Sequence, residues 1–220
     1  MTAEQLGPTI IPDVSISKEG IQSASIGEAM IIVNFDPNIN GENATDPKIA
    51  VVVEKKSKPS SKRIAGQRSI PIETRKVGES RIDNIRGGIA EICNDEMLGQ
   101  VRANFFLVES GLGQTLCSGN VVGLSVLIYN GNISMPFTPI NVEEVGFAGW
   151  ISMNELLEAE DVREIAKDFI KTARDTGLIA SALRDFKTRG LSTQLFPADF
   201  SINQFYAQRE STGIDVKFTL

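Results

Sequence analysis

Two short apolar runs open the patterned part of the chain. Ala29–Phe35 has the composition of a strand, and Lys48–Glu54 is β-branched and continuous, the pattern of a strand covered on both faces. Residues 36–47, which lie between them, are rich in Asn, Asp, Gly and Pro and predict a surface loop. A further short extended piece is expected around Gln67–Ile72.

Residues 80–98 follow with the period of a helix. Ser80 suits the N-cap, and Asp83 favours the positive end of the helix dipole. Gly87–Gly88 breaks the pattern, because each glycine in a helix interior costs about 1 kcal/mol against alanine. Such a pair indicates a kink, a close neighbour or a ligand against the backbone. The apolar stripe of this helix consists of Ile82, Ile85, Ile89 and Ile92.

The second half of the chain has strands first and helices afterwards. This order predicts an α+β sandwich, with a mixed β-sheet covered by helices, and not the βαβ alternation of a dinucleotide-binding fold. The expected strands are Ala103–Glu109, Asn120–Tyr129 and Val145–Trp150, and the expected helices are a capping-box helix from Ser152 through Glu158, then Asp161–Thr176 and Leu178–Thr188.

These elements divide the chain into three parts. Residues 1–29 are polar and weakly patterned and are expected to form an N-terminal arm. Residues 30–190 hold the patterned elements and form the predicted domain. Residues 191–220 have scattered aromatic side chains without a period, which indicates a C-terminal docking tail.

Charge is distributed unevenly. The net charge of the 220 residues is −6, but residues 55–86 hold ten Lys or Arg against three Asp or Glu, a local +7 that leaves −13 for the remainder. An acidic protein is a poor candidate for binding duplex nucleic acid. A local cationic segment suits a small polyanion better, although residues 55–63 are equally expected to be a solvated loop.

The rare residue types restrict the chemistry. The chain has no histidine, which excludes Ser–His and Cys–His catalysis and His-ligated zinc, so a metal site would need oxygen ligands, as Mg²⁺ or Mn²⁺ prefers. Cys93 and Cys117 lie among apolar residues and are expected to be buried free thiols. No secretory signal or membrane-spanning run is visible, so a cytoplasmic location is expected.

The segment Pro71–Leu98 resembles the catalytic box of the Nudix superfamily. Pro71 and the turn Gly78-Glu79-Ser80 match the approach to that box, whereas Ile72 and Glu73 stand where the family has two glycines. Residues 143–158, with Trp150, are similar to the family's last strand and the start of its next helix. The resemblance spans residues 48–172 and implies an α/β/α sandwich that hydrolyses a nucleoside diphosphate derivative with Mg²⁺ or Mn²⁺.

The family's metal ligands are glutamates at positions i, i+3 and i+4 of the box helix, and two registers place them differently. Without a gap they fall on Gly88, Glu91 and Ile92, and the box arginine becomes Gly87. With three extra residues they fall on Glu91, Asn94 and Asp95, on a helix face separate from the isoleucine stripe. Glu91 is the residue that serves in both registers. The resemblance implies Glu79, Glu91, Asn94 and Asp95 as metal ligands, Glu91 and Glu109 as catalytic residues, and Arg68, Arg75 and Arg81 as phosphate ligands. A carboxylate in residues 141–144 is the alternative to Glu109 as the base.

Three functions follow from these residues. The first is a Nudix-like protein that binds a nucleoside diphosphate derivative or a similar phosphorylated small molecule, with weak or lost hydrolysis. The second is an active Mg²⁺-dependent pyrophosphohydrolase acting on ADP-sugar-type substrates. The third is a structural or interaction subunit whose arm and tail pack against a copy of itself, which would form a homodimer, or against another protein. A similar fold does not decide among them, because function resides in the site.

Overall fold

An open, mixed β-sheet forms the centre of the molecule. The computed structural model describes residues 9–10, 27–36, 46–57, 64–76, 79–115, 121–134, 136–189 and 193–212. Strand β2 runs parallel to β7, and every other strand pair in the sheet is antiparallel. The strands are β1 (Thr9–Ile10), β2 (Gly27–Asn34), β3 (Lys48–Glu54), β4 (Arg68–Ser69), β5 (Ile72–Thr74), β6 (Phe105–Thr115), β7 (Val121–Tyr129), β8 (Val145–Ser152) and β9 (Thr193–Gln194).

The strand order places β2 in the middle of the sheet. The path runs β1-β6-β7-β2-β3-β4, while β5 pairs with β2, β8 with β3, and β9 with β6. Strand β2 alternates between the two faces: Ala29, Ile31 and Val33 belong to one buried cluster, and Met30 and Ile32 to the other. The central strand is therefore covered on both sides.

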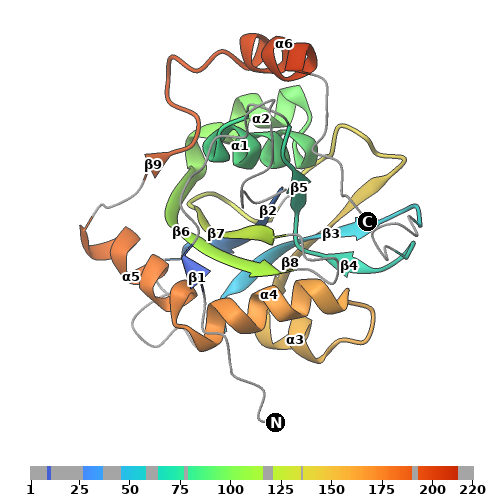
Figure 1. Ribbon diagram of the computed structural model, residues 1–220, viewed down its shortest axis with the longest axis vertical. Coiled ribbons are helices and arrows are strands. Elements are labelled where there is room, and N and C mark those ends of the chain that lie inside the picture. The colour runs from blue at the N-terminus through green and yellow to red at the C-terminus, as the bar shows by residue number, and fades with distance from the viewer. Residues whose placement is uncertain are drawn as a thin grey trace.

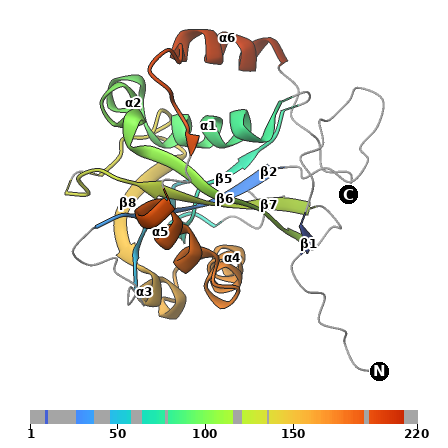
Figure 2. The ribbon, with the colours of Figure 1, turned by 90° about the vertical axis from the view of Figure 1, so that its left-hand side faces the viewer.

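Helices cover both faces of the sheet. Figure 2 shows α1 and α2 on one side of it and α3, α4 and α5 on the other, with α6 lying outside α1. The same arrangement is seen in Figure 1, where α1, α2 and α6 lie above the sheet. Their bounds are α1 (Arg81–Ile92), α2 (Asp95–Val101), α3 (Met153–Glu158), α4 (Glu164–Asp175), α5 (Leu178–Arg189) and α6 (Ile202–Thr212), and a short 3₁₀ helix, η2 (Arg102–Asn104), precedes β6.

The two hydrophobic clusters differ in what they contain. The cluster under α4 and α5 is mainly aliphatic and includes Phe169 and Ile170 of α4. The cluster under α1 is rich in aromatic rings: Phe105, Tyr129 and Phe137 lie with their ring centroids 5.0–5.7 Å apart. Such tilted and edge-to-face pairs add to the burial of apolar area. The rigid aromatic layer supports the α1 side of the sheet.

The C-terminal part of the described chain packs onto the α1 side. Leu195 and Phe196 are buried in the aromatic cluster, and Phe205 of α6 is nearly buried there. The guanidinium of Arg86 donates to the carbonyl of Leu195 at 2.6 Å and lies over the ring of Phe200. The predicted docking tail, as far as residues 193–212 describe it, lies against its own chain.

The α+β class with a mixed sheet between helices is confirmed. Strand β3 has the predicted bounds and both faces covered, and α3 begins after the predicted N-cap, where the Ser152 hydroxyl accepts the Glu155 N–H at 3.2 Å. The predicted continuous helix over residues 80–98 is wrong, because the chain forms two helices there. The N-terminal arm, apart from residues 9–10 and 27–29, and Cys117 lie outside the described residues. Within the described residues, no helix is long and apolar enough to cross a membrane.

The burial of Cys93 gives a testable expectation. Its thiol is fully buried and free, and burial raises its pKa to about 12, so about one thiol in ten thousand is ionised at pH 8. In a Cys117→Ser variant we expect negligible labelling by Ellman's reagent under native conditions and full labelling in guanidinium chloride. Native labelling at the unfolded rate would contradict the buried position.

Candidate functional site

Helix α1 begins where the sequence predicts. The Ser80 hydroxyl accepts the Asp83 N–H at 3.1 Å and donates to the Asp83 carboxylate at 2.7 Å. Asp83 also pairs with Arg86 at 2.9 Å, one turn further on. Ile85, Ile89 and Ile92 are buried as expected, and Ile82 is half-buried. The cap and the stripe together fix which face of α1 is turned to the sheet.

The end of α1 decides the register of the box. The helix stops at Ile92, Cys93 is extended, and Asn94 caps the separate helix α2 by accepting the Met97 N–H at 2.9 Å. Backbone groups of residues after β7 bind the chain between the two helices. The Thr138 carbonyl accepts the Asn94 N–H at 2.6 Å, and the Ile140 N–H donates to the Glu91 carbonyl at 3.0 Å. Asn94 and Asp95 therefore do not share a helix face with Glu91, which corrects the geometry assumed for the second register.

The first register also lacks a ligand set. Gly88 is buried against Met30 and Glu73, and Ile92 belongs to the aromatic cluster, so Glu91 is the one carboxylate of that register. Among the described residues, no group of three or more His, Cys, Asp or Glu is arranged to hold a metal ion. As they are arranged in this structure, the residues present therefore do not fit the Mg²⁺ or Mn²⁺ that the resemblance implies. The metal-binding roles of Glu79, Glu91, Asn94 and Asp95 stay predictions.

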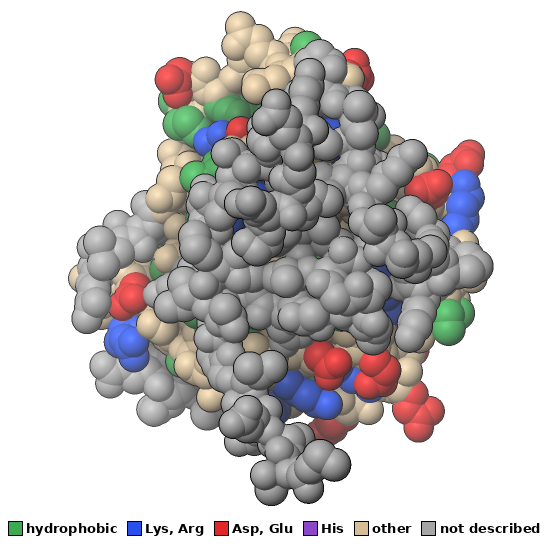
Figure 3. All heavy atoms as spheres, in the orientation of Figure 1, with side chains coloured by type: hydrophobic (Ala, Val, Ile, Leu, Met, Phe, Trp, Pro, Cys, Tyr) green, Lys and Arg blue, Asp and Glu red, His purple; other side chains and the backbone are tan. Residues whose placement is uncertain are grey.

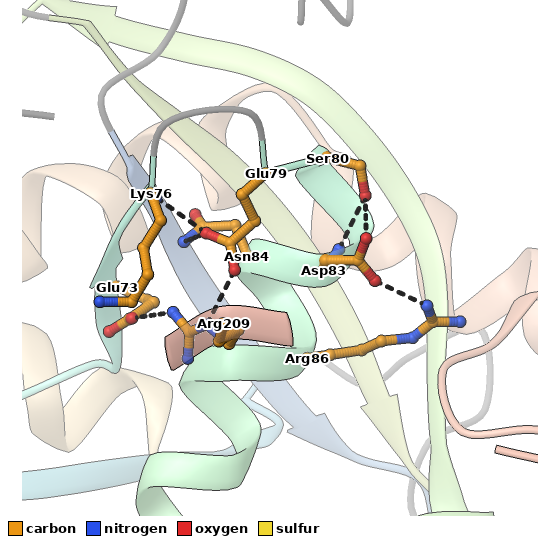
Figure 4. Close-up of polar contacts among 8 residues, drawn as sticks. All are labelled: Glu73, Lys76, Glu79, Ser80, Asp83, Asn84, Arg86 and Arg209. Carbon is orange, nitrogen blue, oxygen red and sulfur yellow. Dashed lines mark hydrogen bonds and ion pairs between the residues drawn. The ribbon is translucent and has the colours of Figure 1, made fainter. Parts of the chain in front are cut away.

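Three carboxylates lie close together beside α1, and the group among them is the guanidinium of an arginine. Glu73 lies in β5, Glu79 precedes the helix cap, and Glu91 lies in the last turn of α1. The guanidinium of Arg209, from α6, hydrogen-bonds Glu73 and pairs with Glu79 at 2.8 Å between Nε and Oε1. Figure 4 shows Arg209 reaching between Glu73 and Glu79 from outside α1. We name Glu73, Glu79, Glu91 and Arg209 the α1 cluster.

The second oxygen of Glu79 is fixed by the local chain. Its Oε2 accepts the backbone N–H of Lys76 at 2.9 Å and the side-chain amide of Asn84 at 3.3 Å (Figure 4). Both Glu79 and Asn84 are buried. Glu79 thus ties β5 and the segment after it to α1, and the turn Gly78-Glu79-Ser80 contributes a structural contact as well as an acidic side chain. Gly78 itself lies outside the described residues.

Burial and neighbouring charges act in opposite directions on the α1 cluster. Burial raises the pKa of Glu73 to about 8, and the Glu91 carboxylate adds to this rise while Arg209 opposes it. Burial by itself would lower the pKa of Arg209, but Glu73, Glu79 and Glu91 outweigh it and the pKa of the guanidinium is raised. Arg209 therefore remains a cation among these carboxylates.

The glycine pair of α1 makes room for this arrangement. A Cβ at Gly87 would overlap the guanidinium of Arg209, and a Cβ at Gly88 would overlap the side chain of Met30. Of the three explanations that the sequence allows, the structure has the close neighbour, on both sides of the helix. Gly87 is also the position to which the ungapped register assigns the box arginine.

The predicted phosphate ligands lie apart and are engaged elsewhere. Arg68 donates to Asp161 at 2.8 and 2.5 Å and pairs with Glu155 at 3.6 Å, at the α3–α4 side of the sheet. Arg81 pairs with the fully buried Glu28 and donates to the Leu124 carbonyl at 3.1 Å. The third, Arg75, is buried directly after β5. Their phosphate-binding role stays a prediction, and the carboxylates that Arg68 and Arg81 pair with, Asp161 and Glu28, are not members of the α1 cluster.

The remaining predicted residue is Glu109. It lies in β6, opposite Val126 of β7, and its side chain lies outside the described residues. Sequence reasoning missed Glu73 and Arg209. Glu73 was noted only as a departure from the family's glycine, and Arg209 lies in a segment without apolar period, 136 residues away. The glycine pair was the one signal in the sequence that something lies against α1.

Several solved structures are similar to this chain. The Nudix domain of Shewanella oneidensis NrtR, solved with ADP-ribose, is 12% identical, with 73% of this chain and 92% of that chain covered and a TM-score of 0.47. A Nudix hydrolase from M. smegmatis, RenU, is 10% identical, with coverages of 74% and 94% and a TM-score of 0.43. NrtR solved with a 27-mer DNA is 10% identical, with coverages of 84% and 82% and a TM-score of 0.41.

No family model matches this chain, and no curated protein does either. The similar solved structures include Nudix domains and hydrolases, the family that the sequence resembles. The expectation that this chain does not bind duplex nucleic acid stays a prediction.

The buried pair at the start of α1 predicts a large effect on stability. Glu28 accepts hydrogen bonds from Arg81 and Ser125 and is fully buried. In Arg81→Ala an uncompensated charge remains inside the fold, and we expect the free energy of unfolding to fall by about 3–5 kcal/mol. Chemical denaturation measures this.

The matched control is Arg68→Ala. Its partner Asp161 is 53% exposed, so we expect a loss of about 1 kcal/mol or less. An equal loss of unfolding free energy in the two variants would show that the buried Glu28–Arg81 pair contributes no more to stability than an exposed ion pair.

Proposed function

We propose that this chain is a Nudix-like protein that binds a nucleoside diphosphate derivative, or a similar phosphorylated small molecule, and hydrolyses it weakly or not at all. The observation that supports a loss of hydrolysis is the arrangement of the acidic side chains next to α1. Glu73 and Glu79 pair with Arg209, and the residues of the predicted ligand set do not converge from one helix face. Metal-assisted hydrolysis needs an ion that polarises the phosphate and activates water. The donor set for that ion is incomplete.

The ligand class rests on charge and on the resemblance. Residues 55–86 keep a local excess of cationic side chains, which favours a small polyanion. Two of those side chains, Arg68 and Arg81, neutralise carboxylates within the fold. The phosphate would therefore be bound by other donors in that segment or by backbone N–H groups. The Nudix-like motifs around Pro71 and Trp150 are what point to a nucleoside diphosphate derivative.

The contacts of α6 weaken the interaction-subunit alternative. The described part of the tail buries Leu195, Phe196 and Phe205 against its own domain, which leaves these apolar side chains unavailable to a second protein. Self-association through other surfaces stays a prediction that light scattering tests.

Calorimetric titration with ADP-ribose and a panel of nucleoside diphosphates tests binding. We expect heat of binding in EDTA, with an affinity that changes less than about threefold when Mg²⁺ is added, because no complete metal site contributes. Absence of binding both with and without Mg²⁺ would overturn the binding proposal.

A turnover assay with the same compounds and Mg²⁺ tests the lost hydrolysis. We expect no turnover above the background, and no difference among the wild type, Glu91→Gln and the control Glu96→Gln, whose side chain is exposed on α2. Turnover that falls at least about tenfold in Glu91→Gln alone would favour the active pyrophosphohydrolase instead.

A further inference from the structure

We infer that Arg209 is a built-in counter-cation that stands in place of a metal ion at the carboxylates of Glu73, Glu79 and Glu91. Docking of the last turns of α6 and binding of a divalent cation at these carboxylates then exclude each other. This goes beyond the proposed function, because it concerns how the chain itself neutralises the box and does not depend on which ligand it binds.

The contacts of the guanidinium support this role. Arg209 comes from α6, Glu73 from β5, Glu79 from the segment before α1, and Glu91 from the end of α1. The Arg209 side chain is 11% exposed, and its two ion-pair partners are 11% and 4% exposed. Charges removed from water to this degree persist in a fold only when they are paired. The buried guanidinium therefore requires these carboxyl groups.

The shape of α1 supports it independently. Gly87 has a lower helix propensity than alanine, yet any side chain there would overlap the guanidinium. The glycine leaves a space on the outer face of α1 that the guanidinium of Arg209 fills. A divalent cation at the same carboxylates would compete for that space and for the same oxygen atoms.

The first turns of α6 are held by apolar contacts, so the ion pairs of Arg209 affect mainly its C-terminal end. Phe205 packs in the aromatic cluster, lies 5.5 Å from Phe200 between ring centroids, and carries the Arg209 guanidinium 5.8 Å above its ring. On the face shown in Figure 3, hydrophobic side chains gather just beneath the top of the molecule, where Figure 1 places α6. Loss of Arg209 should free the end of α6 while Phe205 stays in place.

Thermal unfolding of the full chain in EDTA and in millimolar Mn²⁺ tests the inference with the metal alone as probe. We expect the wild type to unfold at the same midpoint in both solutions. Arg209→Gln should unfold roughly 5 °C lower in EDTA and recover at least half of that loss in Mn²⁺, because the cation replaces the missing guanidinium. Arg184→Gln, which removes an exposed arginine from α5, should behave as the wild type.

Either of two results would overturn the inference. The first is an Arg209→Gln midpoint equal to that of the wild type in EDTA, which would mean that the guanidinium is not needed as a counter-charge. The second is a lowered midpoint that Mn²⁺ does not raise, which would mean that the carboxylates do not take a cation.

Two further variants keep the test valid if Arg209→Gln does not fold. Gly87→Ala retains Arg209 but fills its space, and we expect electron paramagnetic resonance to detect bound Mn²⁺ in Gly87→Ala and not in the wild type. Adding Glu73→Gln to Gly87→Ala should abolish that binding. Equal Mn²⁺ binding by the wild type and Gly87→Ala, or binding that survives Glu73→Gln, would contradict competition at the α1 cluster.

Discussion

Negative charge buried around α1 is the constraint on which this side of the molecule depends. Glu28, Glu73 and Glu79 are all largely removed from water, on the same side of the sheet. A buried carboxylate is tolerated only with a partner, and the chain supplies Arg81 to the first and Arg209 to the other two. These two arginines connect α1 and α6 to β2 and β5, and so fix how the helical layer lies on the sheet.

The same constraint separates the framework of the site from its chemistry. The cap at Ser80 and the isoleucine stripe are placed as the sequence pattern predicts, and Glu79 lies directly before the cap. The positive charge next to Glu73 and Glu79, however, comes from the side chain of Arg209. A guanidinium neutralises carboxylates and satisfies their oxygens, but it cannot lower the pKa of a bound water as a metal ion does. The guanidinium thus neutralises the carboxylates without supplying the means of activating water that a metal ion would supply.

The fold was largely predictable because it follows from local patterns. Lys48–Glu54 is apolar on both faces and forms the predicted strand, and Ser152 with Glu155 opens α3 as a capping box does. The break between α1 and α2 was missed because the apolar period continues through it. Asn94 ends the helix with its side chain, and residues 138 and 140, which bind the backbone at the break, are distant in sequence. Arg209 was missed for the same reason: no local pattern marks a side chain whose partners lie in β5 and before α1.

The distance along the chain between Glu73 and Arg209 has a consequence for folding. The pair closes a loop of 136 residues, and the entropy of closing a loop increases with its length. The strands and α1 are built from closer contacts and are expected to form first. During that interval Glu73 and Glu79 lack the guanidinium that neutralises them in the folded chain, and their carboxyl groups must remain hydrated or protonated. Completion of the α1 cluster is thus a late event in the order of assembly, and it removes these two carboxyl groups from water.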